Sequence, residues 1–501
     1  ELLVLCGIKH AELDESKHKY KGRIVYRGDK VFTQNGDIVL FTEVSTSPTT
    51  LIALNVCLWW GALEGHATST ADAVQAFLQS YLPEDELTFV ILPRQLWLSQ
   101  WKSKFNGKVA VKLRKSLYGH PQAGRLWQEF LETRISRIGA QQIQGFPSNF
   151  LFNLDGHRML LNIYVDDLTL SGASHLHTKF WQRFSELIKI EDPQTLLPNN
   201  AVLILGRLHE LETPQTIVMS MVGYADQFVQ LYLEITGVDP KSLRKVATPH
   251  INDSTLADAL YEQPGSMKPH ASKVPMKGLW LARLCRPDIS FSVGRLASRI
   301  TVWSRAEDVH LHRLVAYVHW TREYKMICQA GTLSDTELHV YADADLASCV
   351  HTARSTSGMM IFLSSGASRW PIAWNSRRQT SVARSTTEAE IISMAGAVFS
   401  EGQPLLDLLG QLLGRQITMR LKEDNAATLS ILHSGYSVKL RHASRTHRID
   451  LASLAELINE RHMQPEHVNS EDQSADALTK VIQPMLWDRL LQLLSVRQST
   501  P

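Results

Sequence analysis

The stretch LLNIYVDDLTLSG, residues 160–172, places two adjacent aspartates between two apolar runs. Apolar runs around a short polar centre predict a β-hairpin, with Asp166 and Asp167 at or beside its turn. Neighbouring residues of a strand point to opposite faces, so both carboxylates face one point only if the turn redirects one of them. An exposed Asp-Asp turn is the simpler interpretation of the pair alone, and its neighbours in the sequence decide against it.

Upstream, the segment ADAVQAFLQSYL places Asp72 at the start of an apolar element. Taken by itself, Asp72 is also consistent with a helix N-cap. Between the two acidic sites lies the basic segment KLRKSLYGHPQAGRLW, residues 112–127. Its Gly119 and Gly124 allow close backbone approach to a ligand, and its Tyr118 and Trp127 are candidates for base stacking. An acid, a basic loop and an acid pair, in that order, suit two-metal phosphoryl transfer.

Three of these motifs carry a resemblance to a known family. The runs YVDD (164–167), LYGHPQAGRLW (117–127) and DAVQAFL (72–78) resemble, in order and spacing, the reverse transcriptase of copia-type LTR retrotransposons. The segments KYKGRIVYRGD (19–29) and CRPDISF (285–291) resemble two further boxes of that family.

The resemblance implies roles for individual residues. It implies that Asp72, Asp166 and Asp167 are metal-binding catalytic carboxylates. It also implies that four residues lie against the incoming nucleotide and template, namely Lys21 and Arg23 in the fingers and Gly119 and Gln122 in the loop.

A second group of acids follows residue 334. Asp343 and Asp345 end the alternating run ELHVYADAD. Glu388 and Glu390 lie in a helical segment that Ser385 caps, and Asp424 ends a strand-like run. Together with Asp476, which lies near the start of a late helix, they form a set that can converge on a pair of metal ions. Taken singly, each of these acids is more often a cap or a solvated turn residue.

The boxes around these acids resemble a ribonuclease H domain of the same retrotransposon family. They read YADAD (341–345), RSTSG (354–358), STTEAE (385–390), EDN (423–425) and SADALTK (474–480). The resemblance implies Asp343, Glu390 or Glu388, Asp424 and Asp476 as nuclease residues. Glu390 is favoured, because Ser393 and Ala397 then continue a small-residue helix face.

The chain departs from the family at several positions. His447 and Arg448 are exchanged relative to the family's box, which leaves open the histidine expected to assist product release. Asn149 replaces an aspartate, and His120-Pro121 and Leu346-Ala347-Ser348 replace other family residues. None of these changes removes an implied metal ligand.

Length and composition limit the remaining possibilities. The 501 residues correspond to three or four folding units, and 52 Lys and Arg against 50 Asp and Glu leave a net charge of +2. Basic residues are nevertheless in excess in residues 101–140 and 277–325, where a local field can attract a polyanion. Five scattered cysteines without a CxxC pair argue against disulfides and zinc and predict a reducing compartment.

The apolar run 51–63 is shorter than a membrane span and predicts a core helix. The spacing of apolar residues predicts a further amphipathic helix over 311–318. The chain starts at Glu1 and shows no signal peptide, and we expect it to be a fragment of a longer translation product.

The expected fold is α+β, a right-hand polymerase followed by a helical connection and a ribonuclease H-like mixed sheet. The predicted boundaries are 1–248 for fingers, palm and thumb-like elements, 249–334 for the connecting helical region and 335–501 for the nuclease with its C-terminal helix. The expected activities are RNA-directed DNA polymerisation and degradation of the RNA strand of an RNA:DNA hybrid. The alternative is an inactive remnant that binds nucleic acid.

Mg²⁺ is the expected cofactor and Mn²⁺ a substitute, because both suit carboxylate oxygens. The resemblance further implies RNA template, DNA primer, RNA:DNA hybrid and deoxynucleoside triphosphates as partners, with the integrase and capsid products of the same polyprotein and no membrane. The implied location is the cytoplasm, within virus-like particles, or the nucleus.

Overall fold

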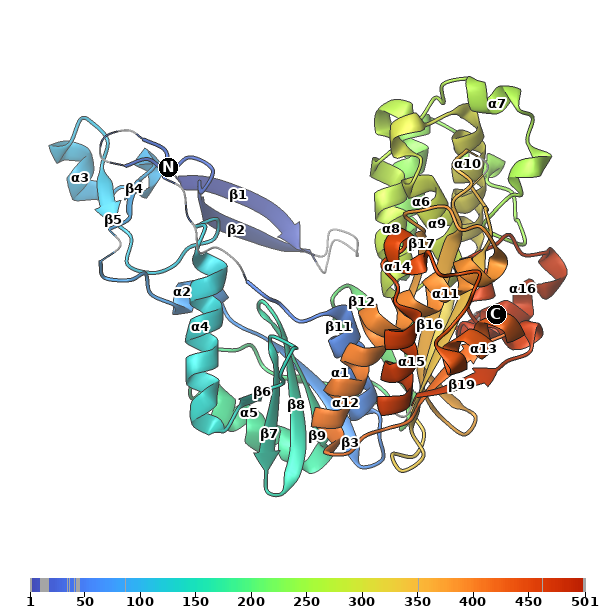
Figure 1. Ribbon diagram of the computed structural model, residues 1–501. Helices are drawn as coiled ribbons and strands as arrows, with labels where there is room; N and C mark the ends of the chain where they lie inside the picture. Colours follow the sequence, from blue (N-terminus) through green and yellow to red (C-terminus); the bar gives the residue numbers. More distant parts are fainter. Residues whose placement is uncertain are drawn as a thin grey trace. The chain divides into compact units, whose positions relative to one another are not determined.

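The computed structural model describes residues 2–9, 18–33, 35, 37–39, 41, 46–85, 87–349, 351–461 and 463–498. Contacts divide the chain into two compact units, whose elements are labelled in Figure 1. The first unit comprises residues 1–50 and 69–194, and the second comprises residues 51–68 and 195–501.

A six-stranded sheet with the order β10-β3-β9-β8-β7-β6 forms the centre of the first unit. Its strands are β3 (His66–Asp72), β6 (Gln141–Gln142), β7 (Asn149–Leu154), β8 (His157–Tyr164), β9 (Asp167–Ala173) and β10 (Gln194–Thr195). Helices α4 (Ala123–Ile135) and α5 (His177–Ser185) contribute Trp127, Leu131 and Phe184 to the apolar core of this sheet. The hairpin predicted at 160–172 is therefore confirmed as β8 and β9.

Smaller elements complete the first unit. They are the antiparallel pair β1 (Leu2–Lys9) and β2 (Lys19–Tyr26), the pair β4 (Phe89–Ile91) and β5 (Ala110–Lys112), and helices α2 (Ala76–Gln79) and α3 (Ser99–Lys104).

A five-stranded mixed sheet with the order β17-β16-β15-β18-β19 lies in the second unit. Its strands are β15 (Glu337–Asp345), β16 (Thr356–Ser365), β17 (Ser368–Arg378), β18 (Met419–Glu423) and β19 (Met463–His467). The pairs β15–β16 and β16–β17 are antiparallel, whereas β18 runs parallel to β15 and β19 parallel to β18. Strand β15 is buried over most of its length, as expected of a strand covered on both faces.

The helices of this region are α11 (Thr386–Ala397), α12 (Gln403–Leu413), α13 (Ala426–Ser434), α14 (Ala443–Thr446) and α15 (Leu451–Glu460). Helix α11 packs against β15, the strand that carries Asp343. Helix α1 (Leu51–Gly61) belongs to the same unit and contacts β17, where the Asn55 side-chain amide donates to the carbonyl of Ile372. The core helix predicted at 51–63 is thus confirmed.

A second sheet of the same unit, with the order β11-β12-β13-β14-β20, is accompanied by a group of helices. Its strands are β11 (Val202–Ile204), β12 (Arg207–Thr213), β13 (Thr216–Ser220), β14 (Lys325–Gln329) and β20 (Val496–Arg497). The helices are α6 (Val222–Thr236), α7 (Ala259–Glu262), α8 (Lys273–Leu284), α9 (Ser290–Ala297), α10 (Arg305–Trp320) and α16 (Pro484–Leu493). Ser304 and Glu307 form a capping box at the start of α10, which confirms the helix predicted over 311–318.

The CRPDISF segment, residues 285–291, is buried in the core of this region. The buried Arg286 guanidinium binds both carboxylate oxygens of Asp288 at 2.8 Å, and the Tyr317 hydroxyl donates to Asp288 at 2.9 Å. This closed network satisfies a charge pair that burial would otherwise make costly.

The α+β prediction, with a mixed sheet in the C-terminal region, is confirmed. The division between the two units does not fall at residues 248 and 334, and as limits of functional regions those boundaries stay a prediction. Within the described ranges, every helix is too short or too polar to cross a membrane.

Candidate active sites

The first acid set lies where two neighbouring inner strands of the six-stranded sheet, β3 and β9, end and begin. Asp72 is the last residue of β3, and Asp167 is the first residue of β9, the strand beside it. Asp166 lies in the two-residue turn between β8 and β9, and its carbonyl accepts a hydrogen bond from the amide of Ala73 at 2.8 Å. The backbone therefore holds the two acidic segments side by side.

The hairpin turn has an unusual backbone. Val165 has φ of 59°, a left-handed conformation that a β-branched residue rarely adopts. The indole Nε1 of Trp127 donates to the carbonyl of Val165 at 2.7 Å and helps to hold this conformation. Asp166 is exposed, whereas Asp72 and Asp167 are half-buried. Strain of this kind is often kept where a turn must aim a functional side chain.

The basic loop packs against strand β2 in the same unit. Gly119 has φ of +83°, and a Cβ atom on it would lie 2.2 Å from the carbonyl oxygen of Tyr26. Tyr118 accepts the amide of Tyr26 at its carbonyl, and its ring contacts Phe77 and the guanidinium of Arg23. Burial and the negative charge of Asp166 raise the pKa of the Tyr118 hydroxyl. Arg23, Tyr118 and Asp166 are thus electrostatic neighbours.

Other residues predicted in this loop are less accessible. Gln122 is buried and directly precedes α4, and its backbone N–H donates to His120 Nδ1. Trp127 is buried in the apolar core, so its proposed role in base stacking is not supported. Lys21 is exposed on β2, opposite Gly7.

The second acid set converges more closely. One carboxylate oxygen from each of Asp343, Glu390 and Asp424 lies within 4.8 Å of the other two. Asp343 is on β15, Glu390 is on α11, and Asp424 directly follows β18. Asp343 and Glu390 are buried, and the Ser393 hydroxyl ties α11 to β15 by donating to the carbonyl of Asp343 at 2.8 Å.

This cluster accumulates negative charge in a poorly solvated place. Burial and the neighbouring Asp343 raise the pKa of Glu390 to about 10. Burial and the nearby Asp424 also raise the pKa of Glu423, at the end of β18, to about 8. Within the described residues, one buried carboxylate oxygen of Glu390 and one of Glu423 have no hydrogen-bond partner. A site with crowded, unpartnered carboxylate oxygens fits a hard divalent cation.

Asp476 lies beside this cluster and forms an ion pair with Lys480. Burial and the negative charge of Asp343 raise the pKa of Asp476 to about 7. Lys480 Nζ lies 2.8 Å from Asp476 and 3.8 Å from Asp343. Burial opposes the charge of this ammonium, but the attraction of Asp343 and Asp476 raises the pKa of Lys480 to about 12. The hydroxyl of Thr479 donates to Asp343.

Glu388 does not join the cluster. Its Oε1 lies 2.7 Å from His442 Nε2 and 2.6 Å from His447 Nε2, and its Oε2 accepts the amide of Arg384 at 2.7 Å. Of the two glutamates that the sequence left open, Glu390 therefore lies with Asp343 and Asp424. His447 is held by Glu388, and Arg448 is exposed with φ of 58°.

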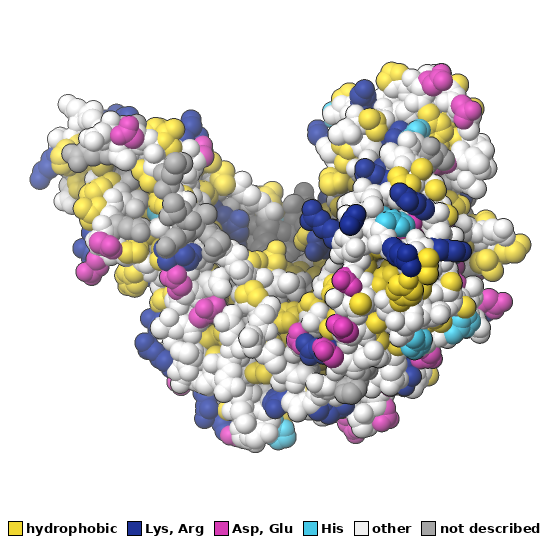
Figure 2. Space-filling view, viewed as in Figure 1, with side chains coloured by type: hydrophobic (Ala, Val, Ile, Leu, Met, Phe, Trp, Pro, Cys, Tyr) yellow, Lys and Arg dark blue, Asp and Glu magenta, His cyan; other side chains and the backbone are white. Residues whose placement is uncertain are grey.

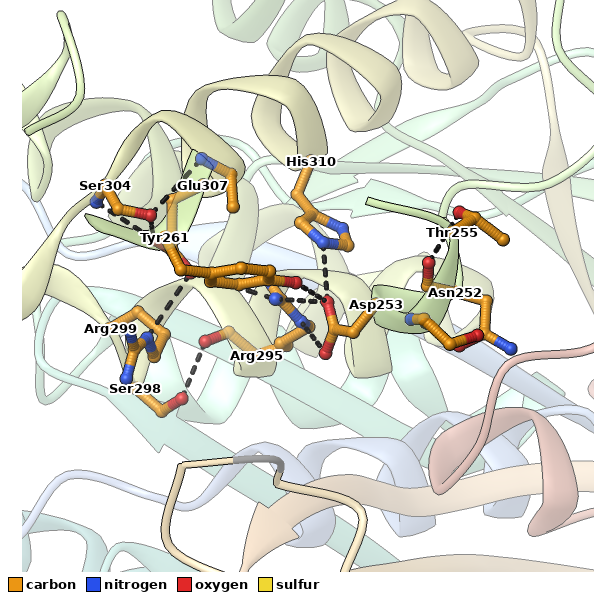
Figure 3. Close-up of polar contacts among 12 residues, drawn as sticks. Asn252, Asp253, Thr255, Tyr261, Arg295, Ser298, Arg299, Ser304, Glu307 and His310 are labelled. Carbon is orange, nitrogen blue, oxygen red and sulfur yellow. Dashed lines mark hydrogen bonds and ion pairs between the residues drawn. The ribbon is translucent and has the colours of Figure 1, made fainter. Parts of the chain in front are cut away.

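A cavity of about 690 Å³ in the second unit extends as far as Lys480, the residue that binds Asp476 beside the cluster. It is lined by Arg299 and Arg378 and by Lys480, the cation beside Asp343. Figure 3 shows a polar network that also lines the cavity, in which His310, Arg295 and Tyr261 all bind Asp253. Although burial raises the pKa of Asp253, hydrogen bonds from His310 and Arg295 hold it well below its usual range.

Sequence reasoning missed several of these residues. Glu423 stands beside the predicted Asp424, and strand alternation was the available signal, since residues 419, 421 and 423 all face inward. The position of Lys480, four residues after Asp476 in the SADALTK box, was a second signal. The Asp253 network lies in a proline-interrupted stretch and has no comparable signature.

The chain is similar to known proteins along most of its length. Residues 7–193 match the family described as reverse transcriptase (RNA-dependent DNA polymerase). Over 97% of its length the chain is 26% identical to the retrovirus-related Pol polyprotein from transposon RE1 of Arabidopsis thaliana, of which it covers 31%. It is 25% identical over 93% of its length to that from transposon TNT 1-94 of Nicotiana tabacum, of which it covers 33%. The chain thus spans about a third of these curated relatives.

Among solved structures, the chain is similar to the foamy viral protease-reverse transcriptase in complex with an RNA/DNA hybrid. The identity is 13%, the TM-score is 0.46, and the match covers 93% of this chain and 50% of that one. The sequence matches confirm the predicted resemblance to copia-type retrotransposon Pol polyproteins, with a reverse transcriptase domain at residues 7–193.

Proposed function

We propose, from the reverse transcriptase domain of residues 7–193 and the polyprotein similarity of nearly the whole chain, that the protein is an RNA-directed DNA polymerase joined to a ribonuclease H. It extends a DNA primer on an RNA template with deoxynucleoside triphosphates and then cuts the RNA strand of the hybrid. The observation that carries the nuclease half is the convergence of Asp343, Glu390 and Asp424 within 4.8 Å.

Both activities use divalent metal, Mg²⁺ by preference and Mn²⁺ as a substitute, because the candidate ligands are carboxylate oxygens. Asp343, Glu390, Asp424 and Asp476 hold it in the nuclease, and Asp72, Asp166 and Asp167 hold it in the polymerase. When bound, the metal supplies an activated attacking oxygen and stabilises the leaving one. The unpartnered carboxylate oxygen of Glu390 and the crowding that raises its pKa support this assignment.

The chain's own residues orient the reactants. Lys480 offsets part of the charge of Asp343 and Asp476, and it lines the same cavity as Arg299 and Arg378. The cavity is lined by four cations and four acids, so its charge is mixed. Among its cations, Arg378 binds a serine hydroxyl rather than a carboxylate and is the candidate for a phosphate contact. In the polymerase, Arg23 and Lys21 bind the triphosphate from β2, and Gly119 and Gln122 shape the loop beside it.

Further basic residues surround the nuclease. Lys and Arg side chains gather on the face in Figure 2, over the region where Figure 1 labels α8, β17 and α14. The segment around α14 contributes exposed Lys439, Arg441, Arg445 and Arg448. Although the net charge of the whole chain is near zero, this local concentration of positive charge suits binding to a phosphate backbone.

The deciding experiment measures primer extension on RNA and cleavage of an RNA:DNA hybrid in the full chain. Asp166→Asn is expected to abolish extension alone, and Asp424→Asn cleavage alone. An inactive nucleic-acid-binding remnant would show neither activity in the unmodified chain but would still bind the hybrid in the presence of a chelator. Loss of both activities from either single substitution would contradict two separate sites.

The similarity to retrotransposon polyproteins supports a further proposal about partners. We infer that integrase and capsid products accompany it in cytoplasmic virus-like particles, and that its DNA product reaches the nucleus. The functional regions 1–248, 249–334 and 335–501 are part of this proposal.

A further inference from the structure

A cluster outside the carboxylate site has the composition of a metal centre. Glu388, His442 and His447 each present one possible ligand atom, and these three atoms lie within 4.8 Å of one another. In the second unit this group lies apart from Asp343, Glu390 and Asp424, which form their own group by the same criterion. The carboxylates proposed above to hold magnesium are not part of it.

The three residues come from two segments that meet at the start of α11. Glu388 lies in the first turn of α11, while His442 directly precedes α14 and His447 directly follows it. The side chains of Glu388 and His447 are 2% and 3% exposed, and that of His442 is 26% exposed. Two ligands are therefore fixed in the interior, and the third leaves a path from solvent.

Neighbouring groups already orient the ligand atoms. The Ser381 hydroxyl lies 2.7 Å from His447 Nδ1, which turns the Nε2 of that ring toward Glu388. The amide of Arg384 binds Glu388 Oε2 and leaves Oε1 to the two imidazoles. Partners of this kind on the far side of a histidine or carboxylate are typical of metal ligands, whose orientation they fix.

The ligand set selects the kind of ion. Two imidazole nitrogens and one carboxylate oxygen suit zinc and similar first-row divalent ions, whereas Mg²⁺ prefers oxygen ligands throughout. Zinc binds such nitrogens and oxygens at about 2.0–2.2 Å in a tetrahedral arrangement, so ligand atoms stand roughly 3.3 Å apart. The distances of 2.7 and 2.6 Å from Glu388 Oε1 to the two imidazole Nε2 atoms therefore need to widen by roughly 0.6 Å. The ion then takes the place of the protons on these two nitrogens.

We propose that Glu388, His442 and His447 form a second metal site, which binds a zinc-class ion and clamps the segment around α14 to helix α11. The fourth position of the ion, on the side of the partly exposed His442, is left to water. The clamp is separate from the magnesium site, and its function does not depend on hybrid cleavage.

The test loads the chelator-stripped full chain with Zn²⁺ in excess Mg²⁺, which keeps the carboxylate cluster filled, and measures zinc retained after gel filtration. About one zinc per chain is expected in the unmodified protein and in Asp424→Asn. The variant His442→Ala/His447→Ala is expected to retain little zinc. The matched control His433→Ala/His467→Ala removes two exposed imidazoles of the same region and should retain it.

A thermal melt with and without Zn²⁺ keeps the test decisive if the double variant folds poorly. Zinc is expected to raise the melting temperature of the unmodified chain but not that of His442→Ala, whose ring is the most exposed of the three. His442→Ala alone should weaken zinc binding at least about tenfold. Equal zinc retention in His442→Ala and the unmodified chain, or none in either, would overturn the proposal.

Discussion

The two acid sets of this protein are built differently. In the first unit, Asp166 sits exposed on a hairpin turn, and the backbone, through the amide of Ala73, holds it beside the end of β3. In the second unit, Asp343 and Glu390 are buried and their carboxylates converge with that of Asp424. In the described residues, Asp72, Asp166 and Asp167 form no group with ligand atoms within 4.8 Å of one another.

This difference separates the two proposed metal sites. The nuclease cluster is assembled by the fold, which brings like charges together at the cost of desolvation and partly offsets it with Lys480. The acids proposed for the polymerase are more exposed to water. In the metal-free protein their charge therefore carries a smaller desolvation cost. We expect the nuclease to respond to small changes in packing and charge, and the polymerase to changes in its loop.

The largest expected effect comes from the nuclease glutamate. Glu390→Gln should lower hybrid cleavage about 10³-fold, because losing a metal-binding carboxylate removes about 4 kcal/mol of transition-state stabilisation. Primer extension should stay within about twofold, since the two sites are independent. Steady-state cleavage and extension rates of one preparation measure both.

Glu388→Gln makes the same chemical change two residues away and is the matched control. Its carboxylate binds His442 and His447 rather than the cluster, so cleavage should fall by less than about tenfold. The opposite ranking of the two variants would assign the nuclease glutamate to Glu388.

A change in the polymerase loop should produce the reverse selectivity. Gly119→Ala forces a Cβ to within 2.2 Å of the Tyr26 carbonyl at a positive φ, and strain of about 1–3 kcal/mol should displace the loop from β2. Primer extension is expected to fall about 10–100-fold, with hybrid cleavage intact. Gly107→Ala, where a Cβ meets nothing within 4 Å, is the control and should retain both activities.

The pH dependence of stability should expose the crowded carboxylates. Glu390 and Asp476 have pKa values raised to about 10 and about 7, whereas unfolded carboxyls titrate near about 4. Between about pH 5 and 7 these two carboxyls therefore bind protons in the folded chain that they lose on unfolding. Their contribution to the unfolding free energy should fall as pH rises, by about 1.4 kcal/mol per pH unit for each such proton, whereas buried His209 and His250, whose pKa values burial lowers to about 3 and about 4, act in the opposite direction.

Melts in chelator at pH 5, 6 and 7 measure this slope, and adding Mg²⁺ at pH 7 should restore stability. The slope should be shallower in Glu390→Gln, which carries no charge at that position. The same slope in Glu390→Gln as in the unmodified chain would mean that the acids do not crowd one another.

The smallest expected effect concerns the tie between α11 and β15. Ser393→Ala removes hydrogen bonds to the carbonyls of Asp343 and Gly358 and should cost about 1–2 kcal/mol of stability, with a several-fold loss of cleavage. Denaturant unfolding and cleavage rates check both. Ser453→Ala, at an exposed position of α15, should change neither; an equal loss there would remove the special role of Ser393.

The sequence by itself determined the local elements and the order of the acids. Apolar runs around Asp166 predicted the hairpin, alternation predicted β15, and the serine before the STTEAE helix predicted the N-cap that Ser385 provides. These signals are local, because strand period, helix period and capping depend on residues within a few positions of each other.

Only the tertiary structure decided which side chains meet. Glu388 and Glu390 lie in one motif, yet one faces two histidines and the other faces Asp343 and Asp424, since residues two apart on a helix point in different directions. Trp127 turned out to be core rather than a stacking surface, and Glu423 and Lys480 joined the nuclease site. Such contacts depend on how helices dock on sheets, which brings together residues that are far apart in the chain.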